Sequence, residues 1–462
     1  MAVINTIKYN TLWGGLPVFI IPALASVYFA VIMPVSYDEA WTFVHFTHEG
    51  FTTSVTHYPA PNNHILHSVI TNVTKYIPLL SDLLKLRISS IIANVIGMAV
   101  LYRFISKHFN QNMALAVVAL SSMIFMNVYY SYMSRGYGLY NLFFIAALFM
   151  AFNIARNIST RKSWFFFSMY CILGFYAIPT FVYAFVMLHA FLLFSLKKMT
   201  RPQLISGAVV CAVVLLLYTP IILTDGIQAL THISIERKMT FFNAAKAIPG
   251  YYLIILREMT SFHWLVMLLP LITSIILLIK RRQKRDVYFS LLFLVMPALL
   301  LPLHHVIPFV RVFNYYSALF VIIILLPYKD QIAGMKKWIL ITALLAAQII
   351  LLVHFNNQVY RYEERDLAVN ITADKIIPDI IGNRRYFFDG VLLRTNLEFH
   401  LITGGYQRYT IFDRHAFLAS ADTLQAYDFA FIRKDMDKTV KTPLYGKTAY
   451  YNIYKLSRNE EH

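Results

Sequence analysis

The sequence has little charge for its length. Only 14% of its 462 residues are Asp, Glu, Lys or Arg, whereas 58% are hydrophobic, and a soluble protein carries about 25% charged residues. This composition excludes disordered chains, collagens and coiled coils. Apolar runs of roughly 18 or more residues recur along the chain, and each is long enough to cross a bilayer. The sequence therefore predicts an all-α polytopic membrane protein.

Acidic residues and cysteines are also scarce. Only nine of the 23 Asp and Glu residues precede Phe355, against 26 of the 41 Lys and Arg residues. The excess of positive charge thus lies among apolar segments, where basic residues report topology, so we expect no nucleic-acid partner. The two cysteines, Cys171 and Cys211, fall inside apolar runs and say nothing about the redox compartment.

Eleven membrane spans are predicted. The first of them is too long for a cleavable signal peptide, contains Pro17 and Pro22, and is followed by no small-residue cleavage site. The apolar runs lie at about residues 15–35, 88–106, 112–131, 138–155, 163–179, 180–197, 204–223, 263–280, 287–303, 311–327 and 337–354.

The connections between these spans differ in charge. Alternate connections hold 17 basic residues and only Asp286 and Asp330 as acids, whereas the short connections on the other side hold Arg135, Arg311 and little else. Because basic residues concentrate on the cytoplasmic side, we expect a cytoplasmic N-terminus and an extracytoplasmic C-terminus. The predicted location is the inner (plasma) membrane, with many passes.

Two outer loops and the C-terminal region are not spans. The first outer loop contains an amphipathic stretch from Ile65 to Leu80, which predicts a helix lying in the membrane interface. From residue 356 onward charge rises and short β-prone pieces appear, including Phe399–Ile402. We therefore divide the chain into a transmembrane catalytic domain, residues 1–355, and a small α/β extracytoplasmic domain, residues 356–462, with a helix near residues 365–381.

Asp38 and Glu39 are adjacent carboxylates directly after the first span. An arbitrary pair of this kind is most often part of a solvated loop. Here it stands out because the membrane half has so few acids, and a carboxylate at a membrane boundary is a candidate general base. We assign Asp38 and Glu39 as candidate catalytic residues.

Further candidates follow in the same loop. The stretch Tyr58-Pro-Ala-Pro-Asn-Asn-His64 contains turn-forming residues that would fix Asn63 and His64 at the start of the amphipathic helix, as candidate substrate-binding residues. His64 and His67 have a spacing compatible with zinc, but no cysteine or third ligand accompanies them. We expect no metal site.

Two lone arginines mark the remaining outer connections. Arg135 lies in Ser134-Arg-Gly-Tyr137, and Arg311 follows a stretch that begins at His304. A snorkelling arginine at a helix end is the alternative, but a guanidinium is also well suited to binding phosphate. We assign a donor-phosphate role to Arg135, Tyr137 and Arg311, and substrate binding to His305 and Tyr315.

These motifs together resemble a known family. An acidic pair after span one, Asn63-His-Ile-Leu66 before an interfacial helix, and Ser134-Arg-Gly-Tyr137 after span three are similar to the GT-C glycosyltransferases. The most similar branch contains the protein O-mannosyltransferases and the bacterial aminoarabinose and lipopolysaccharide-core sugar transferases. The family pattern has His-Pro-Pro-Leu and Ala-Arg-x-Tyr at the two later motifs, so this chain departs from both.

The resemblance implies a function. The donor would be a sugar on a polyprenyl phosphate that enters from the bilayer, and the acceptor a hydroxyl on a glycan, lipid or protein outside the cytoplasm. Asp38 would accept the proton of the acceptor hydroxyl, and Arg135 and Arg311 would stabilise the departing phosphate, with inversion and without a metal or other cofactor. The alternatives are a transporter or flippase, and an O-antigen polymerase or ligase acting on lipid-linked glycans.

Overall fold

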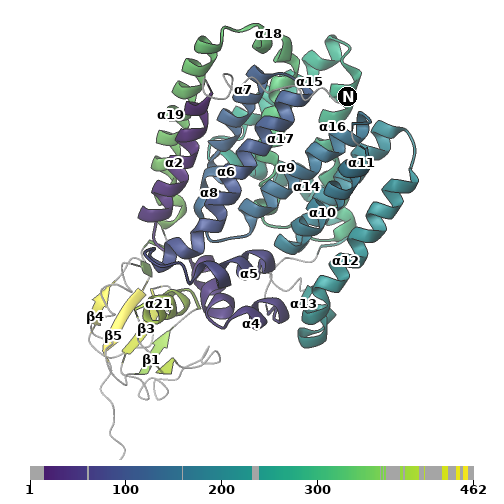
Figure 1. Ribbon diagram of the computed structural model, residues 1–462. Coiled ribbons are helices and arrows are strands. Elements are labelled where there is room, and N and C mark those ends of the chain that lie inside the picture. The colour runs from purple at the N-terminus through teal and green to yellow at the C-terminus, as the bar shows by residue number, and fades with distance from the viewer. Residues whose placement is uncertain are drawn as a thin grey trace, which may run out of the picture.

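The protein, seen in a computed structural model, consists of a helical bundle with a small sheet at one end (Figure 1). The structure describes residues 15–455, apart from 60–61, 159, 231–238, 365, 368, 371–384, 389–390, 405–409, 412–428, 435–443 and 448–450.

Each of the eleven predicted spans corresponds to a helix. The first is α2, the third consists of α7 continued by α8, and the last is α19. Their bounds are α2 (Leu16–Ile32), α6 (Asp82–His108), α7 (Gln111–Ser122), α8 (Phe125–Tyr132), α9 (Tyr137–Ala155), α10 (Thr160–Ala177), α11 (Val182–Leu196), α12 (Arg201–Asp225), α15 (Leu265–Lys280), α16 (Lys284–His304), α17 (Tyr316–Leu325) and α19 (Lys337–Tyr362).

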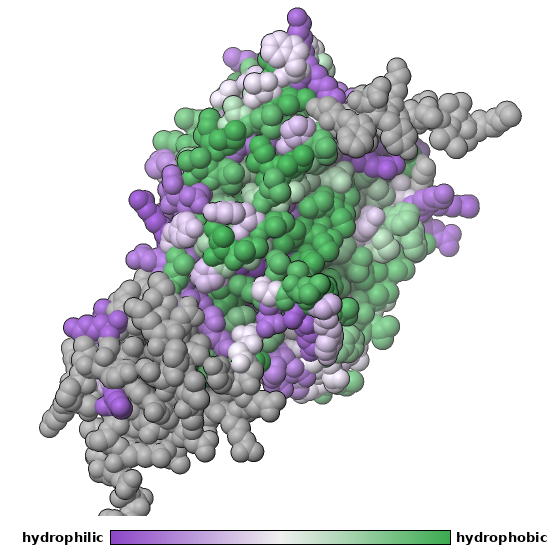
Figure 2. Space-filling view, turned by 60° about the vertical axis from the view of Figure 1, so that its left-hand side comes forward, coloured by the Kyte–Doolittle hydropathy of each residue, from purple (hydrophilic) through white to green (hydrophobic). Residues whose placement is uncertain are grey.

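Not all of these helices meet the length and composition of a span. Within the described residues seven do, and ten if each of three bent pairs counts as one span. The one predicted span that is not among these ten is α10. Arg161 and Lys162 lie in its first turn and lower its mean hydropathy. Figure 2 shows an apolar surface between hydrophilic margins, and outward side chains such as Leu216 and Leu223 are exposed, as expected of a lipid-facing surface.

The shorter elements lie mainly in the connections. Their bounds are α3 (Tyr37–Thr42), η1 (Phe43–Thr47), α4 (Phe51–Thr56), α5 (Ile65–Thr74), η2 (Pro179–Phe181), α13 (Ile227–Leu230), α14 (Phe241–Thr260), η3 (Val310–Phe313), η4 (Leu326–Tyr328) and α18 (Lys329–Gly334). The predicted amphipathic stretch contains α5, which lies across the end of the bundle beside α4 (Figure 1). Its residues Ile65, His67 and Thr71 are buried, whereas Val73 is exposed.

Sharp bends separate three pairs of helices. The chain turns by 76° between α2 and α3–η1, by 73° between α7 and α8, and by 109° between α14 and α15. A helix that ends leaves its last carbonyl groups without intrahelical donors. At the end of α2, the buried Arg87 of α6 supplies donors to the carbonyls of Ala30, Met33 and Pro34, at 3.0, 2.6 and 2.8 Å. This arginine therefore stabilises the first bend.

The C-terminal region is an α/β unit, as predicted. Its five-stranded sheet has the order β2-β1-β3-β5-β4; β1 is parallel to β2 and β3, and the other pairs are antiparallel. The elements are β1 (Arg385–Phe388), α21 (Val391–Thr403), β2 (Thr410–Ile411), β3 (Phe429–Arg433), β4 (Leu444–Lys447) and β5 (Tyr451–Lys455).

One strand prediction in this region is wrong. Phe399–Ile402 lies in α21, where Arg394 pairs with Glu398 one turn away at 3.0 Å and Phe399 packs against Phe43. The ion pair requires helical spacing, and together with the packing of Phe399 it outweighs the β propensity of the piece. The division at residue 355 stays a prediction, since α19 continues to Tyr362, and most of the predicted helix near 365–381 lies outside the described residues.

Candidate active site

Asp38 lies in the first turn of α3, at the end of the first bend. Ser36 caps this helix: its hydroxyl accepts from the Glu39 N–H at 3.3 Å, while the Glu39 carboxylate accepts from the Ser36 N–H at 3.0 Å. The cap fixes the direction in which Asp38 projects. The Asp38 side chain is 27% exposed, and its Oδ2 lies 2.8 Å from Arg311 Nη1 and 3.6 Å from Arg135 Nη2. The site therefore has an accessible carboxylate between two guanidinium groups.

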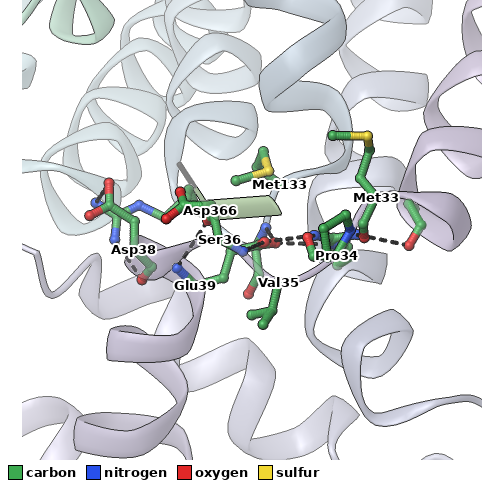
Figure 3. A network of polar contacts seen from close by, with 12 residues as sticks. Met33, Pro34, Val35, Ser36, Asp38, Glu39, Met133 and Asp366 are labelled. Carbon is green, nitrogen blue, oxygen red and sulfur yellow. Dashed lines mark hydrogen bonds and ion pairs between the residues drawn. The ribbon is translucent and has the colours of Figure 1, made fainter. Parts of the chain in front are cut away.

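Glu39 has a different environment from its neighbour. It is fully buried, and Arg87 forms a bidentate pair with it, from Nε at 2.8 Å and from Nη2 at 2.6 Å. Its Oε1 also accepts from the backbone N–H of Ser134 at 2.6 Å. Figure 3 shows this network around Ser36, Glu39 and Met133. With its oxygens occupied by these donors, Glu39 connects α3 to the loop of Arg135.

Arg135 lies in the connection between α8 and α9 and is 2% exposed. Its Nη1 donates to the Asp38 carbonyl and the Thr42 hydroxyl, both at 3.2 Å. Ser90 of α6 also fixes this loop, because its hydroxyl donates to the carbonyls of Met133, at 2.6 Å, and of Arg135, at 3.2 Å. A buried guanidinium held in this way is pre-organised rather than snorkelling toward water.

Arg311 reaches Asp38 from a different element. It lies on η3, its side chain is 29% exposed, and its guanidinium lies 4.6 Å from the ring centroid of Phe309. Tyr137 belongs to the same region: its ring packs against Tyr130 at 4.4 Å and edge-on against His64 at 4.9 Å. Of the predicted phosphate ligands, the structure thus places Arg135 and Arg311 beside Asp38 and Tyr137 beside His64.

His64 is neutral and its tautomer follows from its contacts. The N–H of Gly136 donates to His64 Nδ1 at 2.7 Å, so Nδ1 carries no proton and the proton of the neutral ring is on Nε2. Burial and the charge of Arg135 lower the pKa of His64 well below its usual range. Nε2 lies 3.5 Å from Arg135 Nη2. Because both atoms are donors, they do not bond to each other, and an anionic oxygen would satisfy both.

His67 and Asn63 support this arrangement. His67 lies between the hydroxyls of Ser134, at 2.9 Å, and Ser89, at 3.0 Å, and burial lowers its pKa to about 3. Asn63 donates to the carbonyls of Ser54 and His57, both at 2.9 Å, and its Oδ1 accepts from the Ser68 hydroxyl. The Asn63 amide is thus occupied by its own loop, which it holds in place at the start of α5.

Two predicted substrate-binding residues lie elsewhere. His305 is exposed, has a positive φ of 60°, and donates from Nδ1 to the Met239 carbonyl at 3.2 Å. Tyr315 is buried in an aromatic cluster with Tyr140 and Phe144. Although both residues are close to Arg311 in the sequence, His305 bonds to the segment before α14 and Tyr315 packs against α9.

The structure also shows site residues that the sequence analysis missed. Arg87 is the buried partner of Glu39, and an arginine inside an apolar helix is a signal for such a partner. Glu363 follows α19 and accepts a hydrogen bond from the hydroxyl of Tyr129. No group of three or more His, Cys, Asp or Glu side chains that could hold a metal ion occurs among the described residues. The expectation that the reaction needs no metal stays a prediction.

Comparison with solved structures reveals the fold. The structure of ArnT from Cupriavidus metallidurans bound to undecaprenyl phosphate superimposes with a TM-score of 0.54, covering 95% of this chain and 97% of that one at 11% identity. The chain has the fold of ArnT. The sequence-based resemblance to the GT-C architecture is thereby confirmed at the level of the fold. The apo state of the same protein covers 97% of this chain at 12% identity, with a TM-score of 0.47. No protein-family model and no curated protein matches the chain at a significant level.

Proposed function

We propose that the protein is a membrane glycosyltransferase that moves a sugar from a polyprenyl-phosphate donor to an acceptor hydroxyl on the extracytoplasmic face of the inner membrane. The observation that carries this proposal is the convergence of donors from Arg135, Arg311 and His64 beside one accessible carboxylate, Asp38. The fold it shares with a protein crystallised with undecaprenyl phosphate supports the class of donor.

The donors would bind the phosphate of the lipid. Arg135 and Arg311 carry the positive charge, and the Nε2–H of His64 adds a neutral donor beside Arg135. Negative charge on the phosphate increases as the bond to the sugar breaks, and fixed donors in a partly buried site stabilise that charge without reorganising. In this proposal the two guanidinium groups supply the electrostatic stabilisation, so the reaction is metal-independent.

Asp38 would act as the general base. The acceptor oxygen attacks the anomeric carbon while its proton passes to the Asp38 carboxylate, and the bond from the anomeric carbon to the phosphate oxygen breaks with its electron pair leaving on the phosphate. A single displacement of this kind inverts the anomeric centre. A phosphate bound to the two arginines would compete with Asp38 for their positive charge. The Asp38 carboxylate would then be a stronger base than it is in the free protein.

A flippase or transporter fits the structure less well. Such a protein needs a polar path through its spans. A cavity between α6, α7, α8, α9 and α17, with a lining that includes Asn94, Asn127, Asn141 and Asn314, measures about 30 Å³. This volume holds about two water molecules, which is far too little for a lipid headgroup.

Purified full-length protein in lipid nanodiscs tests the proposal. We expect it to bind undecaprenyl phosphate and to transfer sugar from at least one of a panel of polyprenyl-phosphate pentoses and hexoses to a lipid, glycan or peptide acceptor. Asp38→Asn protein serves as the control, and it should bind the lipid but not transfer. Failure of the wild-type protein to bind undecaprenyl phosphate would contradict the proposed donor class.

A further inference from the structure

The segment that follows α19 contacts the elements that carry both halves of the site. Its first residue, Glu363, is buried and accepts from the hydroxyl of Tyr129 on α8, the helix that leads to the loop of Arg135. Seven residues later Asn370, also buried, donates from Nδ2 to the carbonyl of Val35 at 2.7 Å, directly before α3. One short stretch of chain therefore joins the guanidinium side and the carboxylate side of the site.

Asn370 is itself held by the C-terminal unit. His400 of α21 donates from Nε2 to Asn370 Oδ1 at 2.8 Å, and the Asn370 amide also donates to the carbonyl of Asp366 at 2.7 Å. Figure 3 shows Asp366 near the N-terminus of α3, with Ser36 and Asp38. These contacts fix the orientation of the amide, so that its N–H is directed at the Val35 carbonyl.

Apolar packing reinforces the same contact. Phe399 of α21 meets Phe43 edge-on at 5.1 Å, and both belong to one cluster with Val35, Ala40 and Leu86. The helical segment at this contact, Tyr37–Thr47, consists of α3 continued by η1 and has only eleven residues, six in α3 and five in η1. A helix of that length is unstable without tertiary contacts, because the cost of nucleation exceeds what a few hydrogen bonds return. Its position therefore depends on what packs against it.

We propose that Asn370 is a positioning residue for Asp38, and that α21 makes the C-terminal unit a component of the active site rather than a cover over it. The catalytic consequence rests on the function proposed above, whereas the effect on α3 does not. A displacement of about 1 Å of a catalytic group can reduce turnover by about 100-fold, so loss of the Asn370 contact should affect turnover more than donor binding, which depends on the arginines and His64.

Amide hydrogen exchange of the full-length protein in nanodiscs tests the structural part. In Asn370→Leu we expect exchange of residues 36–42 to be at least about 10-fold faster than in wild type, because local opening of α3 becomes easier. The matched control is Asn396→Leu, since Asn396 is a buried asparagine of α21 whose amide has no hydrogen-bond partner in the described part of the chain. Unchanged exchange of α3 in Asn370→Leu would overturn the proposal.

Kinetics test the catalytic part. Asn370→Leu should lower kcat by at least about 10-fold and shift the acidic limb of the pH–rate profile. The affinity for undecaprenyl phosphate should fall less than kcat does, because Arg311 and His64 belong to elements other than α3. Asn396→Leu should change none of these. A loss of kcat with an unshifted profile and a parallel loss of lipid binding would mean a general loss of folded protein, and would reject the positioning role. Absence of transfer by the wild-type protein would instead reject the proposed function, with the exchange result unaffected.

Discussion

Arg311 Nη1 lies 2.8 Å from Asp38 Oδ2, although 273 residues separate the two in the chain. The fold thus brings together the loop after α2 and the connection between α16 and α17, and Arg135 approaches the same carboxylate from a third element at 3.6 Å. An accessible acid paired with two arginines is an unusual use of scarce charge in a membrane protein, and each partner can be tested separately.

Substitution of Asp38 tests the general base. Asp38→Asn keeps the shape of the side chain and removes the proton acceptor, so transfer should fall by about 10²–10⁴-fold with the protein still folded. Glu39→Gln should act differently, since it leaves the fully buried Arg87 without its counter-charge, and breaking such a pair typically costs about 3–5 kcal/mol. Turnover and thermal stability of both variants would separate the roles, and near-normal transfer by Asp38→Asn would exclude Asp38 as the base.

Arg135 can be tested with a conservative substitution. Arg135→Lys keeps the charge but loses the fork of donors, so it should impair donor binding and turnover almost as much as Arg135→Ala. An arginine that only snorkels would tolerate lysine, because both side chains snorkel equally well. The readouts are the affinity for undecaprenyl phosphate and kcat, and wild-type values for Arg135→Lys would assign the residue to structure alone. Arg311→Lys should behave in the same way.

His64 offers a test of its tautomer. In His64→Asn the amide oxygen can replace Nδ1 as the acceptor of the Gly136 N–H, but no donor remains at the place of Nε2. In His64→Gln the amide can place a donor near the position of Nε2. If the Nε2–H binds phosphate, Gln should retain more affinity for undecaprenyl phosphate than Asn, by about 10-fold for one hydrogen bond to a charged group. Equal affinities would show that only the Gly136 contact matters.

Buried neutral histidines predict a pH dependence of stability. The pKa of His67 is lowered to about 3, and that of His64 is also lowered, because both are buried. Below about pH 6.5 the unfolded chain takes up protons that the folded protein does not, so stability should decrease as pH falls, by up to about 1.4 kcal/mol per pH unit for each histidine. Thermal unfolding at pH 7.5 and pH 5 measures this, and His67→Gln should reduce the difference between the two. An equal difference in wild type and variant would contradict the prediction.

Cysteine labelling tests the topology. In a Cys211→Ser background, Thr52→Cys should react with an impermeant reagent from outside, and Lys336→Cys should stay protected, because basic connections remain cytoplasmic. Ser54, although in the same loop, is unsuitable, since it is fully buried and its hydroxyl donates to the carbonyls of Phe46 and Gly50. Labelling of Lys336→Cys from outside would invert the topology and place the proposed site in the wrong compartment.

The sequence predicted those site residues whose type was rare in its surroundings. Asp38, Arg135 and Arg311 were recognisable because charge is scarce near spans, and all three meet in the structure. The spans were predictable because the length of an apolar run can be read from the sequence alone. The bends were not, because a bend such as that after α2 depends on donors from a distant arginine, Arg87.

Residues whose role depends on distant contacts escaped the sequence analysis. Glu363 and Asn370 lie where charged and polar residues are common, so neither stood out, and their partners Tyr129 and Val35 lie more than 200 residues earlier in the chain. Conversely, His305 is only six residues before Arg311, but it bonds to Met239 whereas Arg311 pairs with Asp38. Proximity in sequence indicates proximity in space only where the intervening backbone is regular.

The bend of 76° after α2 has a consequence for where the polyprenyl-phosphate donor of the proposed reaction would reside. Because α3 turns away from the line of α2, the carboxylate of Asp38 lies beside the end of a membrane helix rather than in a separate soluble domain. Transferring a prenyl chain from the bilayer into water would cost about 0.8 kcal/mol for each CH₂ group. Because the proposed site lies at the end of a membrane helix, the prenyl chain of the proposed donor can stay in hydrocarbon throughout the reaction.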